Sequence, residues 1–134
     1  MTTEIRCRPL DTAELESELG FIRDYLTKAG GISLDVMYGW ACNLEQDELY
    51  KSHPIRVDQL LDFISESRAK GVFGLGESDM HIELPDGNIR IDLCHESDIH
   101  FRGPKEEAEK IHSRWEVKGF RPYVVENKSP PSAT

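Results

Sequence analysis

Four residues near the middle of the chain carry the functional groups of a zinc site. These groups are imidazole, carboxylate and thiol, and they belong to His81, Asp92, Cys94 and His100. A histidine beside a carboxylate can also act as a general base near neutral pH, so one hypothesis is a small metal-dependent hydrolase that uses His81, Asp92 and His100. The four residues lack the close spacing of HExxH or paired CxxC motifs. The sequence therefore predicts no catalytic residue, no cofactor and no metal, and these four residues are the expected ligands if a metal binds.

The same segment concentrates the negative charge of the protein. Residues 76–100 contain seven carboxylates and one arginine, which is a net charge of −6 out of −9 for the 134-residue chain. Such a patch would attract and orient a basic protein partner through long-range electrostatics. It disfavours nucleic acids and anionic membranes, which are bound through clusters of Lys and Arg. The charged residues are Glu77, Asp79, Glu83, Asp86, Asp92, Glu96, Asp98 and Arg90.

Binding of a basic protein is therefore the principal hypothesis, without catalysis. Small acidic inhibitors that mask a basic nuclease-like toxin, as bacterial immunity proteins do, are similar in size and charge. Another interpretation gives the segment no role beyond that of a solvated sheet face, which antiparallel sheets commonly have. The residues expected to contact a partner are Glu77, Asp79, His81, Glu83, Asp92, Glu96, Asp98 and His100.

The elements that would position these groups form an antiparallel meander over residues 79–102. Asp86-Gly87 is a strong two-residue turn signal between alternating hydrophobic residues, and it pairs Glu83 with Arg90 and His81 with Asp92. The apolar face is predicted to hold Met80, Ile82, Leu84, Ile89, Ile91, Leu93, Ile99 and Phe101, and His95 is expected on its side. The polar face is predicted to hold Asp79, His81, Glu83, Arg90, Asp92, Cys94, Asp98, His100 and Arg102.

Three helices are expected to cover the apolar face. The first begins at a capping box of Asp11 and Glu14, ends at the Gly30-Gly31 pair, and places Glu18 on its acidic outer face. The second runs from Pro54 to Gly71, and the third from 103–104 to 119. Strands are predicted at 32–38 and, as an edge strand, at 120–126, with a short helical turn at 46–49.

The predicted fold class is α+β, an antiparallel sheet with helices packed on one face, in the order α-β-α-β-β-β-α-β. The sequence predicts one domain at 1–126 and a disordered Pro/Ser-rich tail at 127–134.

The chain has three cysteines without a CxxC pair, no secretion signal and no long apolar run, and these features predict a cytoplasmic protein. The edge of the last strand would allow pairing with a second copy. Trp40 and Trp115 are expected in the core or at its rim, and either one exposed beside the acidic face would be an anchor for a partner.

Overall fold

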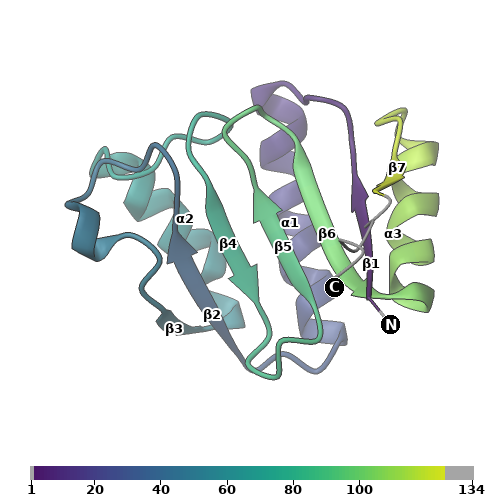
Figure 1. The fold of residues 1–134 in the computed structure, drawn as a ribbon, viewed down its shortest axis with the longest axis horizontal. Coiled ribbons are helices and arrows are strands. Elements are labelled where there is room, and N and C mark those ends of the chain that lie inside the picture. The colour runs from purple at the N-terminus through teal and green to yellow at the C-terminus, as the bar shows by residue number, and fades with distance from the viewer. Residues whose placement is uncertain (1, 126–134) are drawn as a thin grey trace, which may run out of the picture.

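The computed structural model describes residues 2–125 (Figure 1). The predicted disordered tail, 127–134, lies outside the described residues. The elements are β1 (Thr2–Arg6), α1 (Thr12–Lys28), β2 (Ser33–Tyr38), a 3-10 turn (Gln46–Glu48), β3 (His53–Arg56), a second 3-10 turn (Val57–Gln59), α2 (Leu60–Ala69), β4 (Met80–Glu83), β5 (Arg90–Leu93), β6 (Ile99–Pro104), α3 (Lys105–Val117) and β7 (Tyr123–Val125).

The described chain forms an α+β fold, as predicted. Its seven strands make one antiparallel sheet in the order β3-β2-β4-β5-β6-β1-β7. The helices cover one face of this sheet, and the other face is turned toward the viewer in Figure 1. The core lies between the sheet and the helices, because the buried side chains alternate along β4 and β6.

The predicted register of the meander is confirmed. Glu83 lies opposite Arg90 and His81 lies opposite Asp92. The Leu84 N–H donates to the carbonyl of Ile89 at 3.0 Å, which closes the hairpin around the Asp86-Gly87 turn. Gly87 has a φ of 73°, a left-handed conformation that glycine adopts without a steric penalty. The turn residues and the hydrophobic alternation therefore specify the same pairing.

The first helix begins where the sequence predicts. The Glu14 N–H donates to Asp11 Oδ1 at 2.8 Å, and the Asp11 N–H donates to Glu14 Oε1 at 3.0 Å, which together form the capping box. The prediction for Glu18 is wrong, since this side chain is fully buried. It receives hydrogen bonds from Arg114 and from the Trp115 indole, so a buried carboxylate is stabilised there.

Two strands were missing from the predicted element order. β1 precedes α1 and lies between β6 and β7, and β3 follows β2 and forms the opposite edge of the sheet. The helix start predicted at Pro54 is wrong, because Pro54 lies in β3 opposite Asp35, and α2 begins at Leu60. An edge strand tolerates a residue that has no N–H to donate.

The C-terminal part of the described chain agrees with the sequence. β7 is an edge strand, as predicted, and α3 lies within the predicted third helix and buries Ala108, Ile111 and Trp115. Ile32, the first residue of the strand predicted at 32–38, is 78% exposed and precedes β2, which begins at Ser33. Among residues 2–125, no helix combines the length and the apolar composition that crossing a membrane requires.

Candidate functional site

The face of the sheet that the helices leave uncovered, called here the open sheet face, carries two rows of side chains, all of them polar except Met37. The rows follow from the strand pairing, because residues directly opposite one another point to the same side. Both rows cross β2, β4, β5, β6 and β1 in that order. One row is Asp35, Glu83, Arg90, Arg102 and Glu4, and the other is Met37, His81, Asp92, His100 and Arg6.

Asp92 is the centre of one charged cluster on this face. Its side chain is 12% exposed, and its Oδ1 lies 2.8 Å from His81 Nδ1 and 2.8 Å from Arg90 Nε. Burial by itself would raise the pKa of Asp92, but the hydrogen bonds and charges of His81 and Arg90 outweigh it and leave the pKa below its ordinary value. Both members of the predicted His81–Asp92 metal pair are thus engaged with each other and with a guanidinium cation.

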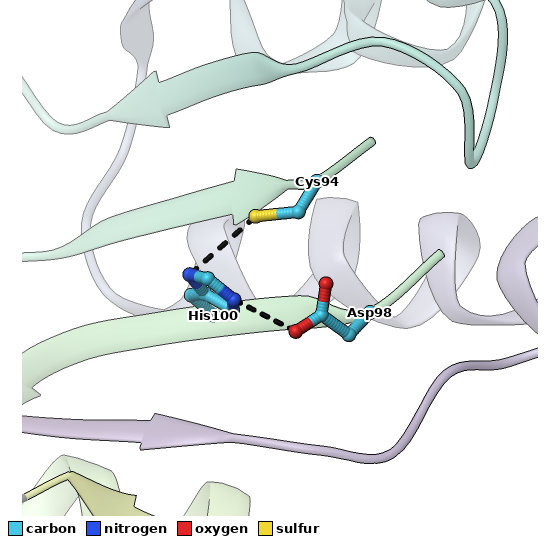
Figure 2. Close-up of side chains that lie close together, drawn as sticks. All are labelled: Cys94, Asp98 and His100. Atoms are coloured by element: carbon cyan, nitrogen blue, oxygen red, sulfur yellow. Dashed lines mark hydrogen bonds and ion pairs between the residues drawn. The ribbon is translucent and has the colours of Figure 1, made fainter. Parts of the chain in front are cut away.

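Cys94, Asp98 and His100 form a second cluster, called here the Cys94 cluster (Figure 2). One ligand atom from each residue lies within 4.8 Å of the other two. Cys94 Sγ lies 3.4 Å from His100 Nδ1, and His100 Nε2 lies 2.8 Å from Asp98 Oδ2. Of the four residues predicted as metal ligands, the structure therefore groups Cys94 and His100 with Asp98.

The electrostatic environment of the Cys94 cluster is negative. Burial raises the pKa of the Cys94 thiol, and the charges of Asp98, Asp92 and Asp79 raise it further. For Asp98, burial opposes ionisation, but the hydrogen bond and charge of His100 outweigh it and lower the pKa. The second oxygen of this carboxylate, Asp98 Oδ1, is buried and has no hydrogen-bond partner among the described residues. An unpartnered buried oxygen is uncommon and calls for a physical reason.

His95 lies on the polar side of the β5–β6 turn, so its predicted orientation is wrong. Its backbone N–H donates to Asp79 Oδ1 at 2.7 Å, and its Nδ1 lies 2.8 Å from the same oxygen. Strict alternation ends with β5 at Leu93, and Ser97 in the following turn has a φ of 69°. The hydrogen bond to Asp79 raises the pKa of His95.

An exposed aromatic side chain stands beside His95. Trp40 is 60% exposed, and its ring centroid lies 6.2 Å from that of His95 in an edge-on arrangement. The carbonyl of Trp40 accepts a hydrogen bond from the Asp79 N–H at 2.8 Å, so the residue belongs to the end of the sheet where β4 begins. Trp40 is therefore outside the core, whereas Trp115 is buried in it.

The acidic residues of segment 76–100 are distributed from one end of the sheet to the other. Glu77 and Glu96 are exposed in the turns that precede β4 and β6, and Ser97 Oγ joins these turns by a hydrogen bond to the carbonyl of Gly76 at 3.2 Å. Asp86 lies in the hairpin at the opposite end, and Glu83 is next to that hairpin. The end of the sheet that carries Trp40, Glu77, Asp79, His95 and Glu96 is called here the Trp40 end; it is the upper end in Figure 1.

Several residues of the open sheet face were not predicted. Tyr50, 58% exposed, stacks on His81 with ring centroids 5.9 Å apart. Glu4 and Arg6 join the face through β1, and Arg6 Nε donates to Glu4 Oε2 at 2.7 Å. No local pattern places Tyr50 on this face, because it follows an irregular segment. The alternation around Ile5 was the available signal for β1, but it is only a few residues long.

No protein-family model, no curated protein and no solved structure matches this chain. The geometry of the open sheet face is therefore the basis for assigning a function.

Proposed function

We propose that the protein binds another protein, without catalysing a reaction, through the Trp40 end of the open sheet face. The exposure of Trp40 carries this proposal. A tryptophan that is 60% exposed leaves a large apolar surface in water and contributes little to the core. Tryptophan and tyrosine are enriched among the residues that dominate binding energy in protein interfaces.

The backbone around the exposed aromatic residues supports the same proposal. Ala41, directly after Trp40, has a φ of 65°, and Tyr50 has a φ of 63°. Left-handed conformations of non-glycine residues cost about 1 kcal/mol each and are concentrated at functional sites. The backbone is therefore strained next to one exposed aromatic residue and at another, which favours a role in recognition over one in stability.

Charge favours a basic partner. Among the described residues, neither Glu77 nor Glu96 takes part in an ion pair, and both are exposed near Trp40. Asp92, in contrast, is already neutralised by Arg90. The free carboxylates would meet cationic side chains at the rim of an interface around Trp40, where they raise the rate of association. We favour an inhibitory role of the bacterial immunity type for this protein, with a basic nuclease-like toxin as the partner.

The competing hypothesis is a metal-dependent hydrolase centred on His81, Asp92 and His100. It has less support, because His81 and Asp92 bond to each other and Arg90 adds a cation at the position where a metal would be needed.

We propose a cytoplasmic location, since the three cysteines are free thiols, which suits a reducing compartment. We expect neither nucleic acids nor membranes among the partners.

The proposal is tested by replacing Trp40. Wild type, Trp40→Ala and Val117→Ala are used as baits in cell extract, and the protein that wild type recovers is then purified for calorimetric titration. Val117 is the matched control, because it is 89% exposed but lies on α3. We expect Trp40→Ala to weaken binding by at least about 2 kcal/mol, roughly 30-fold in Kd. Val117→Ala should bind as wild type does.

A second measurement concerns the charge of the partner. The double variant Glu77→Gln/Glu96→Gln should slow association and reduce its dependence on salt, while dissociation changes little. Equal recovery and equal affinity for wild type and Trp40→Ala would show that the Trp40 end is not the interface.

A further inference from the structure

The Cys94 cluster has the donor types of a zinc site. Thiolate, imidazole and carboxylate are all ligands of Zn²⁺, and three protein ligands leave a fourth position open. The three residues lie within seven positions of the sequence. Their backbone is held by β5 and β6, because the Cys94 N–H donates to the carbonyl of Asp98 at 3.1 Å and Asp92 pairs with His100. The donors are therefore brought together by the fold and not by a flexible loop.

The distances agree with those that zinc requires. One ligand atom from each of Cys94, Asp98 and His100 lies within 4.8 Å of the other two. Zinc bonds of about 2.3 Å to sulfur and about 2.0 Å to nitrogen or oxygen at a tetrahedral angle separate the ligand atoms by roughly 3.3 to 3.5 Å. Small movements of the three side chains would admit the ion.

Each of the two carboxylate oxygens of Asp98 has a feature that favours a bound cation. Its Oδ2 lies 2.8 Å from His100 Nε2, so the carboxylate and this imidazole nitrogen are already as close as two ligands of one ion. Its Oδ1 is buried without a partner. Figure 2 shows this second oxygen on the side of the carboxylate that faces Cys94. A cation between them would provide the partner that Oδ1 lacks.

The surrounding charges favour a cation over a nucleophilic cysteine. Cysteine, histidine and aspartate in this order also resemble a nucleophile, its base and an orienting acid. A nucleophilic thiolate is stabilised by nearby positive charge, whereas the sulfur of Cys94 is surrounded by the carboxylates of Asp98, Asp92 and Asp79, with Arg6 as the opposing charge. A divalent cation is attracted by this field and stabilises the thiolate that binds it.

We propose that Cys94, Asp98 and His100 bind one Zn²⁺ ion on the open sheet face, with a fourth coordination position left for water or for a group of a partner. The site does not rest on the protein-binding function proposed above. His81 and Asp92 are not ligands of this ion.

Metal binding by the full chain tests the proposal. Co²⁺ is the spectroscopic probe, because a thiolate–cobalt charge-transfer band reports a Cys94 bond and the visible bands report tetrahedral geometry. Zn²⁺ affinity is measured by competition with a chromophoric chelator. We expect one ion per chain, a charge-transfer band that Cys94→Ser abolishes, and affinity reduced by roughly 10- to 100-fold or more in Asp98→Asn and His100→Gln.

The control variants are His95→Gln, in the same turn, and His81→Gln, on the same face. Both should retain wild-type affinity and stoichiometry. Circular dichroism and thermal unfolding without metal establish that each variant is folded, and Zn²⁺ should raise the Tm of wild type and of the two controls. The proposal is overturned if wild type binds no stoichiometric Zn²⁺ or Co²⁺, if Cys94→Ser keeps the charge-transfer band, or if His81→Gln loses the ion. Rapid alkylation of Cys94 without metal binding would favour the nucleophile instead.

Discussion

Glu18 shows how a single side chain joins two elements of this protein. It is a carboxylate on α1 with no exposed surface, and it accepts hydrogen bonds from Arg114 Nη2 at 2.6 Å and from Trp115 Nε1 at 3.0 Å. The Arg114 guanidinium also lies over the ring of Phe21, 3.6 Å from its centroid. Three contacts thus fasten α3 to α1, and two of them depend on the acceptor oxygens of Glu18. Such a buried pair is costly to break from one side.

We therefore expect Glu18→Ala to lower the free energy of unfolding by about 3 kcal/mol, because it leaves Arg114 and the Trp115 indole without their acceptor. Glu16→Ala on the same helix is the control. Glu16 forms a surface pair with Arg68, and its loss should cost less than about 1 kcal/mol. Urea unfolding followed by circular dichroism measures both. Equal losses in the two variants would contradict this role of Glu18.

At the scale of elements, the position of β1 matters most, because this strand joins β7 to the rest of the sheet. All five of its residues pair with β6 on one side, and three of them, Glu4, Ile5 and Arg6, pair with β7 on the other. Ile5 is 1% exposed within the core, and Glu4 and Arg6 extend the open sheet face. A segment at the start of the chain is therefore an interior strand of the sheet, and without it β7 would have no strand to pair with.

Ile5→Ala should cost about 2–5 kcal/mol of unfolding free energy, as expected for a large-to-small change in a packed core. Val124→Ala, opposite Ile5 on the edge strand and 55% exposed, should cost less than about 1 kcal/mol. Thermal unfolding of the two variants measures the difference. A loss for Ile5→Ala no greater than that for Val124→Ala would mean that β1 is not packed as described.

At the scale of the whole molecule, the excess of acids is partly compensated by ion pairs in the folded state. Burial opposes ionisation of Glu4, but hydrogen bonds and charges from Arg6 and Arg102 outweigh it, so the pKa is lowered. The pKa of Glu14 is lowered by Arg8, and that of Glu107 by the hydrogen bonds of Tyr25 and Lys110. Folding therefore favours the ionised form of these carboxylates, although the net charge of −9 opposes compaction.

At these sites the folded protein binds fewer protons than the unfolded chain. The stability that these carboxylates contribute is therefore present above the unfolded-state pKa of about 4.3 and is lost as the pH falls below it. We expect the urea midpoint to decrease between about pH 5 and pH 3. Glu4→Gln should reduce the steepness of that decrease, with an unchanged dependence on urea. If relief of self-repulsion dominated instead, stability would rise over this range.

The sequence by itself determined the elements that depend on neighbouring residues. The capping interactions of Asp11 and Glu14, the stripe of α3 and the hairpin around Gly87 are local, so spacing and turn chemistry were sufficient to predict them. The sequence also predicted which residues share the polar face, because alternation and one turn specify the register of β4 and β5. The position of Glu18 is consistent with this rule, because its spacing from Leu15 and Ile22 places it on the buried face and only its charge suggested otherwise.

Only the tertiary structure decided where β1 and β3 pair and which polar groups meet. β1 pairs with β6, which places Thr2 opposite Pro104, and no local pattern contains that information. The Cys94 cluster depends on the β5–β6 turn, where Ser97 leaves the extended conformation, so alternation could not group Asp98 with Cys94 or direct His95 toward Asp79. The exposure of Trp40 was decided in the same way, because burial of a side chain outside regular structure depends on which distant elements cover it.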